Sequence, residues 1–295
     1  MTAIEAPSGK GAGDENFPVG SWLLPARHRS HIMAFYDFVR AADDVADSSD
    51  LSPDDKLERL ELFERALLGD KELWAKLPKA ASLRRSLDAT GITAQHAIDV
   101  LKAFKQDAVK GRYDEWSDLL DYCAYSASPV GRFLLDLHGE DKALYQLSDP
   151  LCDALQILNH LQDCADDFLE LDRIYLPQRY FEHAGIDQSA LTASKTSPAF
   201  RWLLDEVLDG TDTLLRKAAY LPVALTSRRL GAESAVILEM ARKLARQLRQ
   251  NDPIATRVEL TKPAFAITAL LGLGRLQWLR RGRREDQSLP KEAMR

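Results

Sequence analysis

A helix is predicted by Ala34-Phe35-Tyr36-Asp37-Phe38-Val39-Arg40-Ala41-Ala42-Asp43-Asp44-Val45-Ala46-Asp47. Its apolar residues recur every three to four positions, as in a helix that packs one face into a core. The spacing of Asp43 and Asp47 puts both carboxylates on one face, about 6 Å apart along the axis. Arg40 and Tyr36, three and seven residues before Asp43, share that face. The stretch therefore predicts a core helix that ends in concentrated negative charge.

A second aspartate cluster follows 120 residues later, at Asp163-Cys164-Ala165-Asp166-Asp167. Gln156 and Asn159 precede it, so that four polar residues fall at i, i+3, i+7 and i+11 on one helical face. Plain surface would favour Lys and Glu, whereas Asn and Gln commonly orient ligands or waters around a metal. His160, within the same run, is interpreted as a packed or surface histidine and not as a ligand.

Like charges four residues apart destabilise a helix by a few tenths of a kcal/mol. Carboxylates at the end of the first helix are disfavoured further by the helix dipole. Mg²⁺ binds one or two carboxylates together with phosphate oxygens. The two clusters therefore suggest a Mg²⁺–diphosphate site between two helices. The alternative for each cluster alone is a solvated helix end or face.

Two further segments carry residues suited to such a site. The first, Tyr122-Cys123-Ala124-Tyr125-Ser126-Ala127-Ser128-Pro129-Val130-Gly131-Arg132, has small residues around a proline that predicts a kink and space for a ligand. The second, Arg173-Ile174-Tyr175-Leu176-Pro177, places an arginine after the second aspartate cluster. Arginine binds phosphate oxygens through two parallel hydrogen bonds. Close helix packing and a helix-terminal arginine are the alternative interpretations.

Helical periodicity extends through most of the chain, and strand-like alternation is almost absent. Between proline and glycine breaks we predict helices at about 26–47, 54–68, 71–76, 80–88, 93–109, 115–137, 141–171, 178–182, 199–219, 232–249 and 263–280. Short loops indicate one all-α domain at residues 16–281, with a flexible arm at 1–15 and a basic, polar tail at 282–295. A functional cavity is expected between the helices of the bundle.

Composition limits the partners and the location of the chain. The net charge of −6 argues against nucleic acid, and the three unclustered cysteines are typical of a cytoplasmic protein. The N-terminal residues lack the apolar core of a signal peptide, and no apolar run is long enough to span a membrane. The segment Arg275–Arg284 is basic and contains Trp278, so it could rest on an anionic membrane, although a solvated helix end is the plainer interpretation.

The four segments, in this order and spacing, resemble the squalene/phytoene synthase family over about residues 16 to 270. Arg40 with the first aspartate cluster resembles the first metal motif of the family, and Gln156 to Asp167 resembles the second. Within the family, the chain is most similar to the bacterial hydroxysqualene synthase branch of hopanoid biosynthesis. Three stretches carry this similarity: Glu15-Asn16-Phe17-Pro18-Val19, Ala127-Ser128-Pro129-Val130-Gly131 and Asn159-His160-Leu161-Gln162-Asp163-Cys164.

The chain also departs from the family pattern. Squalene and phytoene synthases carry Ser-Arg/Lys-Ser-Phe where this chain reads Asp14-Glu15-Asn16-Phe17, and an acid there repels a second diphosphate. Gln162 replaces an arginine that is common in the reductive synthases. The tyrosine common in a later family helix is absent from Ala235-Val236-Ile237-Leu238. These differences favour one diphosphate substrate and a reaction that ends with water instead of NADPH.

The resemblance implies an isoprenoid-synthase-type helical bundle. It also implies Mg²⁺-dependent conversion of presqualene diphosphate to hydroxysqualene, with release of diphosphate and without NADPH. Metal ligands are then Asp43, Asp44, Asp47, Asp163 and Asp167. Substrate contacts are Asn16, Phe17, Tyr36, Arg40, Tyr122, Ser128, Arg173 and Tyr175, and Tyr125, Asn159 and Gln156 are the catalytic candidates. The implied partners are a prenyl diphosphate, a presqualene diphosphate synthase that hands it over, and the inner face of the membrane.

Other readings remain open at this point. Within the family, the chain could be a presqualene diphosphate, squalene or phytoene synthase. It could also be a non-catalytic member that acts as a scaffold, although such proteins tend to lose the aspartates and both Asp-x-x-x-Asp pairs are intact here. A structural helical protein with accidental acid pairs is the third alternative.

Overall fold

The computed structural model describes Ile4 and residues 23–288, without the side chains of 282–288. Its helices are α1 (Ala26–Ala46), α2 (Pro53–Leu67), α3 (Pro78–Thr90), α4 (Gln95–Asp107), α5 (Trp116–Ser126), α6 (Ser128–Leu137), α7 (Tyr145–Gln162), α8 (Cys164–Leu171), α9 (Gln178–Ala184), α10 (Pro198–Lys217), α11 (Leu221–Ala224), α12 (Arg228–Gln250) and α13 (Lys262–Ser288). Short 3₁₀ turns lie at Lys71–Leu73, Lys142–Leu144, Gln188–Thr192 and Ala218–Tyr220. Within these residues the only β-type pairing is an isolated bridge between Arg112 and Ile174. The predicted all-α fold is confirmed.

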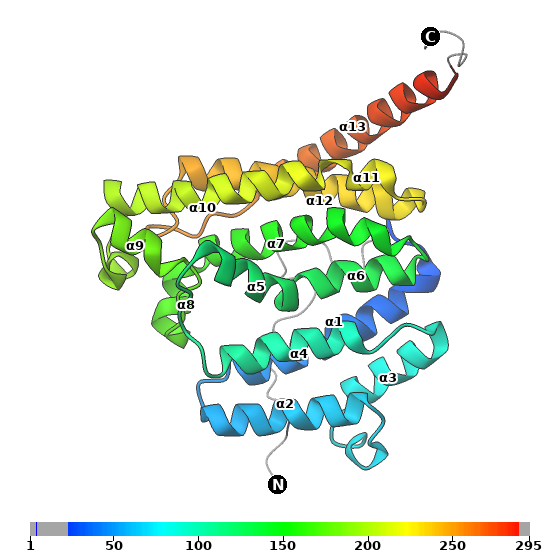
Figure 1. Cartoon of the computed structure of the whole chain (residues 1–295), viewed down its shortest axis with the longest axis horizontal. Helices are drawn as coiled ribbons and strands as arrows, with labels where there is room; N and C mark the ends of the chain where they lie inside the picture. The colour runs from blue at the N-terminus through cyan, green and yellow to red at the C-terminus, as the bar shows by residue number, and fades with distance from the viewer. Residues whose placement is uncertain (1–3, 5–22, 289–295) are drawn as a thin grey trace.

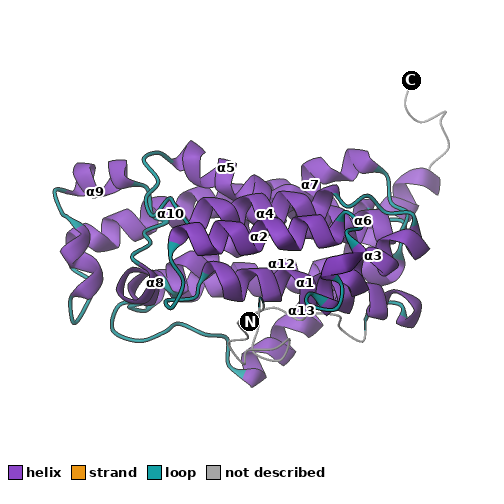
Figure 2. Ribbon diagram, turned by 90° about the horizontal axis from the view of Figure 1, so that it is seen from below, coloured by secondary structure: helices purple, strands orange, loops and turns teal. Residues whose placement is uncertain are grey.

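The helices stack in layers around one core (Figure 1). α10 and α12 pack on α7, which packs in turn on α5 and α6. α1 and α4 pack together below them, with α2 and α3 outermost. Figure 2 shows the same long helices running side by side from a second direction. The helices α1, α4, α5, α6, α7, α8 and α12, from distant parts of the sequence, all contribute residues to the wall of one cavity.

Local sequence explains several helix starts. Ser52, Ser197 and Ser227 each accept a hydrogen bond from a backbone N–H in the first turn of α2, α10 and α12. α12 begins at Arg228, four residues before its predicted start, because the carboxylate of Glu140 also accepts the N–H groups of Thr226 and Ser227. That contact crosses 86 residues of sequence, so local reasoning could not include it.

Two predicted helices are broken in the structure. The expected helix at 115–137 ends at Ser126, and α6 starts at Ser128 with Pro129 in its first turn, since proline lacks the N–H that a continuous helix needs. The expected helix at 141–171 begins only at Tyr145 and is interrupted at Asp163 between α7 and α8. The expected helix at 71–76 is a 3₁₀ turn. α13, in contrast, continues to Ser288, eight residues past its predicted end at 280.

The predicted arm at 1–15 and the end of the predicted tail lie outside the described residues, apart from Ile4. Among the residues that are described, no helix combines the length and the apolar character needed to cross a bilayer. α13 leaves the body of the molecule at one end of the bundle, beside α11 and α12 (Figure 1).

Candidate active site

A cavity of about 1080 Å³ lies between the helices. This is at the upper end of the roughly 300–1,000 Å³ typical of small-molecule sites. Its acidic end is lined by carboxylates with arginines among them: Arg40, Asp43, Asp44, Asp47, Asp107, Asp163, Asp166, Asp167, Glu170, Arg173 and Arg257. Much of the remaining wall is apolar, including Ile32, Phe35, Val39, Phe133, Leu134, Leu151, Leu155, Leu230 and Ile237. The cavity therefore suits a ligand with a charged head and a long apolar body.

The last turns of α1 form the first acidic wall. Arg40 lies 3.1 Å from Asp43 and 2.8 Å from Asp44, measured between guanidinium nitrogen and carboxylate oxygen. Burial raises the pKa of Asp43 well above its usual value, and the charge of Asp47 raises it further. A second source of positive charge at this wall would relieve that repulsion.

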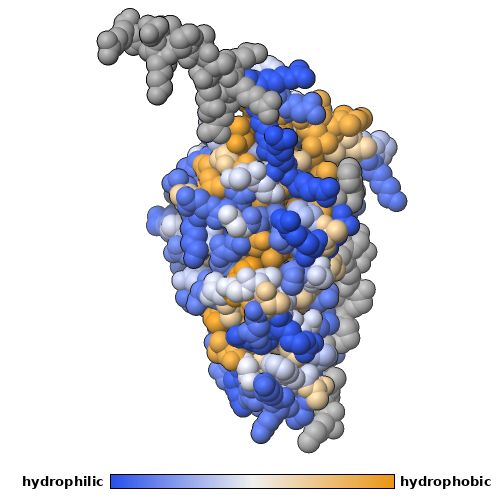
Figure 3. Space-filling view, turned by 90° about the vertical axis from the view of Figure 1, so that its right-hand side faces the viewer, coloured by the Kyte–Doolittle hydropathy of each residue, from blue (hydrophilic) through white to orange (hydrophobic). Residues whose placement is uncertain are grey.

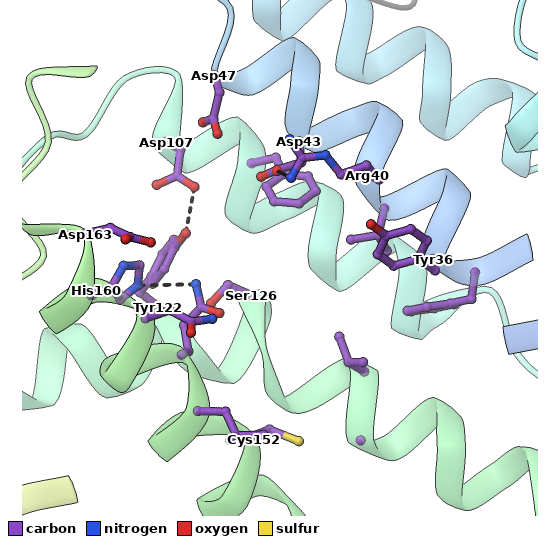
Figure 4. Close-up of a pocket in the computed structure, with 18 of the residues that line it drawn as sticks. Tyr36, Arg40, Asp43, Asp47, Asp107, Tyr122, Ser126, Cys152, His160 and Asp163 are labelled. Atoms are coloured by element: carbon purple, nitrogen blue, oxygen red, sulfur yellow. Dashed lines mark hydrogen bonds and ion pairs between the residues drawn. The ribbon is translucent and has the colours of Figure 1, made fainter. Parts of the chain in front are cut away.

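The junction of α7 and α8 forms the facing wall. The carboxylates of Asp43 and Asp163 point toward each other across the cavity (Figure 4). Although the helix breaks at Asp163, the N–H of Asp167 still donates to the carbonyl of Asp163 at 2.7 Å. The turn therefore continues, and Gln156, Asn159, Asp163 and Asp167 all line the cavity as one polar stripe.

Asp163 also has a basic partner that the sequence did not reveal. Nη2 of Arg257, in the segment between α12 and α13, lies 2.9 Å from Oδ1 of Asp163. Burial raises the pKa of Asp163 to about 6, although Arg257 acts in the opposite direction. Arg257 is about half exposed, so it can turn toward a bound anion. No motif points to it, because its role depends on where the loop folds back.

Arg173 connects the two aspartate-bearing walls. Its Nη1 lies 2.6 Å from Oδ1 of Asp47, and its Nη2 donates to the carbonyl of Ala46 at 2.8 Å. The side chain is buried and lines the cavity, where the sequence predicted an arginine near the diphosphate. Tyr36, Tyr122 and Tyr175 line the same cavity.

Asp107, which sequence reasoning missed, lies between two of these tyrosines. Its carboxylate accepts hydrogen bonds from the hydroxyls of Tyr122 at 2.7 Å and Tyr175 at 3.1 Å. Burial raises its pKa to about 7, and Arg173 opposes that shift. The helical periodicity of the sequence could have revealed it. Asp107 follows Val100, Ala103 and Phe104 at the next position on the buried face of α4. A carboxylate on a core face needs polar partners.

His160 packs as expected. Its ring stacks on Tyr175 with centroids 3.7 Å apart, and its Nε2 lies 3.3 Å from Nε2 of Gln156 (Figure 4). The stack holds the end of α7 against the segment that carries Arg173.

Two predicted site residues do not reach the cavity. Tyr125 is only partly buried and lies under the ammonium group of Lys102, which is 3.7 Å from its ring centroid. Ser128 is buried and donates to Asp153 at 2.8 Å. Neither residue is among those that line the cavity. For Ser128, the break at Ala127 turns the first residue of α6 away from it.

Ser126, at the end of α5, lines the cavity in their place (Figure 4). Its hydroxyl is buried and has no hydrogen-bond partner among the described residues.

The predicted contacts Asn16 and Phe17, with Glu15, lie outside the described residues. Gln162 is buried, and its amide donates to the carbonyl of Val258, so it anchors the loop that carries Arg257.

The carboxylates of the two cavity walls fit Mg²⁺ when a phosphate is present. Within the described residues no three acidic, histidine or cysteine side chains converge as a ready metal cage. Mg²⁺ rarely uses such cages and is instead held by one or two carboxylates, substrate phosphates and water. The facing pairs Asp43 with Asp47 and Asp163 with Asp167 supply that oxygen-only arrangement from two walls.

Comparison with known proteins agrees with this geometry. The family model for squalene/phytoene synthase matches residues 11–264. The chain belongs to the squalene/phytoene synthase family. The hydroxysqualene synthase of Rhodopseudomonas palustris is 45% identical over 91% of both chains. That of Zymomonas mobilis is 40% identical over 94% of this chain and 93% of the relative. The predicted family, its hydroxysqualene synthase branch and the enzyme assignment are confirmed.

A solved structure of this family also matches. The crystal structure of a squalene synthase from Alicyclobacillus acidocaldarius has a TM-score of 0.68 and 29% identity, covering 79% of this chain and 87% of that one. The solved structure therefore agrees with the fold and the family found for this chain.

Proposed function

We propose that this protein converts presqualene diphosphate to hydroxysqualene in bacterial hopanoid biosynthesis. The observation that carries the proposal is the division of one cavity into an acidic end with arginines and a long apolar remainder. The likeness to hydroxysqualene synthases at 40–45% identity supports hydroxysqualene as the product. A diphosphate fits the charged end, and the C30 hydrocarbon fits the rest.

Asp43, Asp47, Asp163 and Asp167 would hold Mg²⁺ ions, with Asp44 assisting through Arg40. When bound, the metal supplies Lewis-acid stabilisation of the leaving diphosphate. Arg40, Arg173 and Arg257 add positive charge to the same group, and Arg173 is already fixed beside Asp47. These preorganised charges favour cleavage of the carbon–oxygen bond because negative charge develops there.

The carbocation left in the cavity rearranges while the walls exclude water. Phe35, Tyr36 and Tyr122 present aromatic side chains along the path from the acidic end into the apolar part. An aromatic face stabilises a cation by about 0.5–2 kcal/mol. The hydroxyl of Tyr122 donates a hydrogen bond to Asp107, and this bond holds the ring of Tyr122 in place.

Water then attacks the rearranged cation and loses a proton to the released diphosphate. The sequence left Gln156, Asn159, Tyr125 and Ser128 as candidates to orient that water, and only Gln156 and Asn159 line the cavity. Ser126 joins them, since its buried hydroxyl is directed into the same space. Ser126→Ala should lower the share of hydroxylated product and raise that of elimination products, whereas Ser128→Ala should leave the product ratio unchanged.

We propose that no NADPH takes part, because Gln162 stands where the reductive synthases commonly carry an arginine. The substrate would be handed over by a presqualene diphosphate synthase. This protein would act in the cytoplasm, at the inner face of the membrane, because substrate and product both carry a long hydrocarbon chain.

The deciding experiment is mass spectrometry of the products formed from presqualene diphosphate and Mg²⁺, with and without NADPH. Hydroxysqualene in both reactions, and none in EDTA, is the expected result. Squalene formed only with NADPH would refute capture by water, and full activity in EDTA would refute the metal assignment.

The second candidate is squalene synthesis, favoured by the name of the Alicyclobacillus acidocaldarius structure. Incubation with farnesyl diphosphate alone separates the two. A C30 product from that substrate would show that the chain performs the first half-reaction, contrary to the argument from Glu15.

A further inference from the structure

α13 is apolar on two opposite faces. Its inner face packs on α12, where Gly272 allows so close an approach that an added Cβ would lie 2.7 Å from the carbonyl oxygen of Ala235. Thr268 and Leu276 are buried on the same side. When a helix has two apolar faces, we expect both of them to be covered.

The outer face is uncovered. It consists of Ile267, Leu270, Leu271 and Trp278, which are 60%, 71%, 62% and 72% exposed. Their spacing of three, four and seven residues puts them on one stripe. Figure 3 shows apolar surface gathered at this end of the molecule beside strongly hydrophilic side chains. Contiguous apolar patches of this kind mark interaction sites on soluble proteins.

The charge around the stripe is positive. From Lys262 to Arg281 the helix carries four basic residues and no acid, in a chain whose net charge is −6. Arg228 and Arg229, exposed at the start of α12, add to this charge, and repulsion from Arg228 helps to lower the pKa of Arg280 after the larger effect of burial. Glu239, the acid that faces α13, is already paired with Arg242 at 2.6 Å and Arg275 at 3.0 Å.

The surface also lies close to the cavity. Ser234 and Ile237 line the cavity from α12, whereas Ala235, on another side of the same helix, contacts α13. α12, about 10 Å across, therefore separates the cavity from α13, whose outer face carries the exposed stripe.

We infer that the outer face of α13 docks this protein on an anionic membrane. The stripe enters the boundary between head groups and acyl chains, Trp278 lies at that boundary, and the exposed Arg281 contacts lipid phosphates. Apolar burial and attraction to anionic lipid act together, as in other interfacial helices. The choice of a bilayer as partner rests in part on the proposed function, since the proposed substrate and product dissolve in lipid.

Flotation of the full-length protein with lipid vesicles tests the docking. The wild type should bind phosphatidylglycerol-containing vesicles and bind pure phosphatidylcholine weakly. The double variant Leu271→Glu/Trp278→Glu should bind more than tenfold more weakly, and Arg281→Gln about fivefold. Leu68→Glu, an equally exposed apolar site at the end of α2, should bind as the wild type does.

Quenching of tryptophan fluorescence by brominated lipid locates the contact. Quenching should occur in the wild type and largely disappear in Trp278→Phe, a variant that still floats. Equal flotation of wild type and the double variant, no binding to any vesicle, or a lipid-free dimer that the double variant dissociates would each overturn the inference. An assay with detergent-dispersed presqualene diphosphate keeps this test separate from the proposed reaction. The double variant should turn over this substrate as the wild type does. Only an inactive wild type would contradict the proposed reaction.

Discussion

The buried Arg173 and the partly exposed Asp47 form an ion pair, 2.6 Å long, between residues 126 positions apart in the chain. The pair joins the end of α1 to the segment after α8 at the acidic end of the cavity. One guanidinium therefore serves both the fold and the proposed leaving-group site.

Removal of this arginine should cost stability as well as activity. Arg173→Met would leave Asp47 and the carbonyl of Ala46 without their partner, and because Asp47 is partly exposed the expected cost is about 1–3 kcal/mol, less than for a fully buried pair. Urea unfolding monitored by circular dichroism measures this loss. Arg179→Gln, which breaks an exposed pair with Glu115, should cost less than about 1 kcal/mol. Equal costs for the two variants would show that Arg173 has no structural role.

Neutralisation of Asp43 should separate stability from turnover. Burial and Asp47 disfavour its charge, so Asp43→Asn in EDTA at neutral pH should be as stable as the wild type or more stable. Mg²⁺ with diphosphate should raise the melting temperature of the wild type but not of the variant, because ligands that bind only the folded state stabilise it. Turnover should fall at least about 100-fold.

Asp37→Asn is the matched control, since Asp37 is exposed on the same helix. It should retain turnover and the response to Mg²⁺ with diphosphate. If Asp43→Asn keeps full turnover, α1 does not hold the metal.

Replacement of Tyr122 and of Tyr125 by phenylalanine should have very different effects on stability and turnover. Tyr122→Phe removes a buried hydrogen bond to Asp107 and should cost about 1–3 kcal/mol and slow turnover, whereas Tyr125→Phe should change both little. Steady-state kinetics and thermal unfolding of the two variants decide between the structure, which puts Tyr122 at the cavity, and the sequence, which favoured Tyr125 as catalytic. A slow Tyr125→Phe enzyme with a normal KM would restore the original assignment.

The Asp153 carboxylate should make stability depend on pH. Burial raises its pKa to about 7, although Ser128 donates a hydrogen bond to it. An acid with a higher pKa in the folded chain binds more protons there, so stability falls as pH rises from about 4 to 7. Asp153→Asn should remove up to about 4 kcal/mol of that decline, measured by urea unfolding across this range.

Ser128→Ala provides the opposing control for Asp153. Loss of the hydroxyl donor disfavours the charged carboxylate, so the decline should extend to higher pH. Identical pH profiles for the wild type and Asp153→Asn would show that Asp153 titrates normally.

The sequence by itself determined the all-α class, the family and the two aspartate pairs. Helical periodicity and i, i+4 spacing are local properties, and local geometry fixes which side chains share a face. Arg40 and Tyr36 could be placed beside Asp43 for that reason, and Gln156 and Asn159 beside Asp163. The proposed chemistry rests mainly on these local relations.

Only the tertiary structure decided which side chains meet across the cavity. Asp107 between Tyr122 and Tyr175, Arg257 against Asp163, and Arg173 on Asp47 all join segments that spacing cannot relate. The break at Ala127 likewise exchanged Ser128 for Ser126, because a change of one residue at a helix start rotates each following side chain by about 100°. Contacts between distant helices depend on how whole faces pack, and packing is settled only when the chain folds.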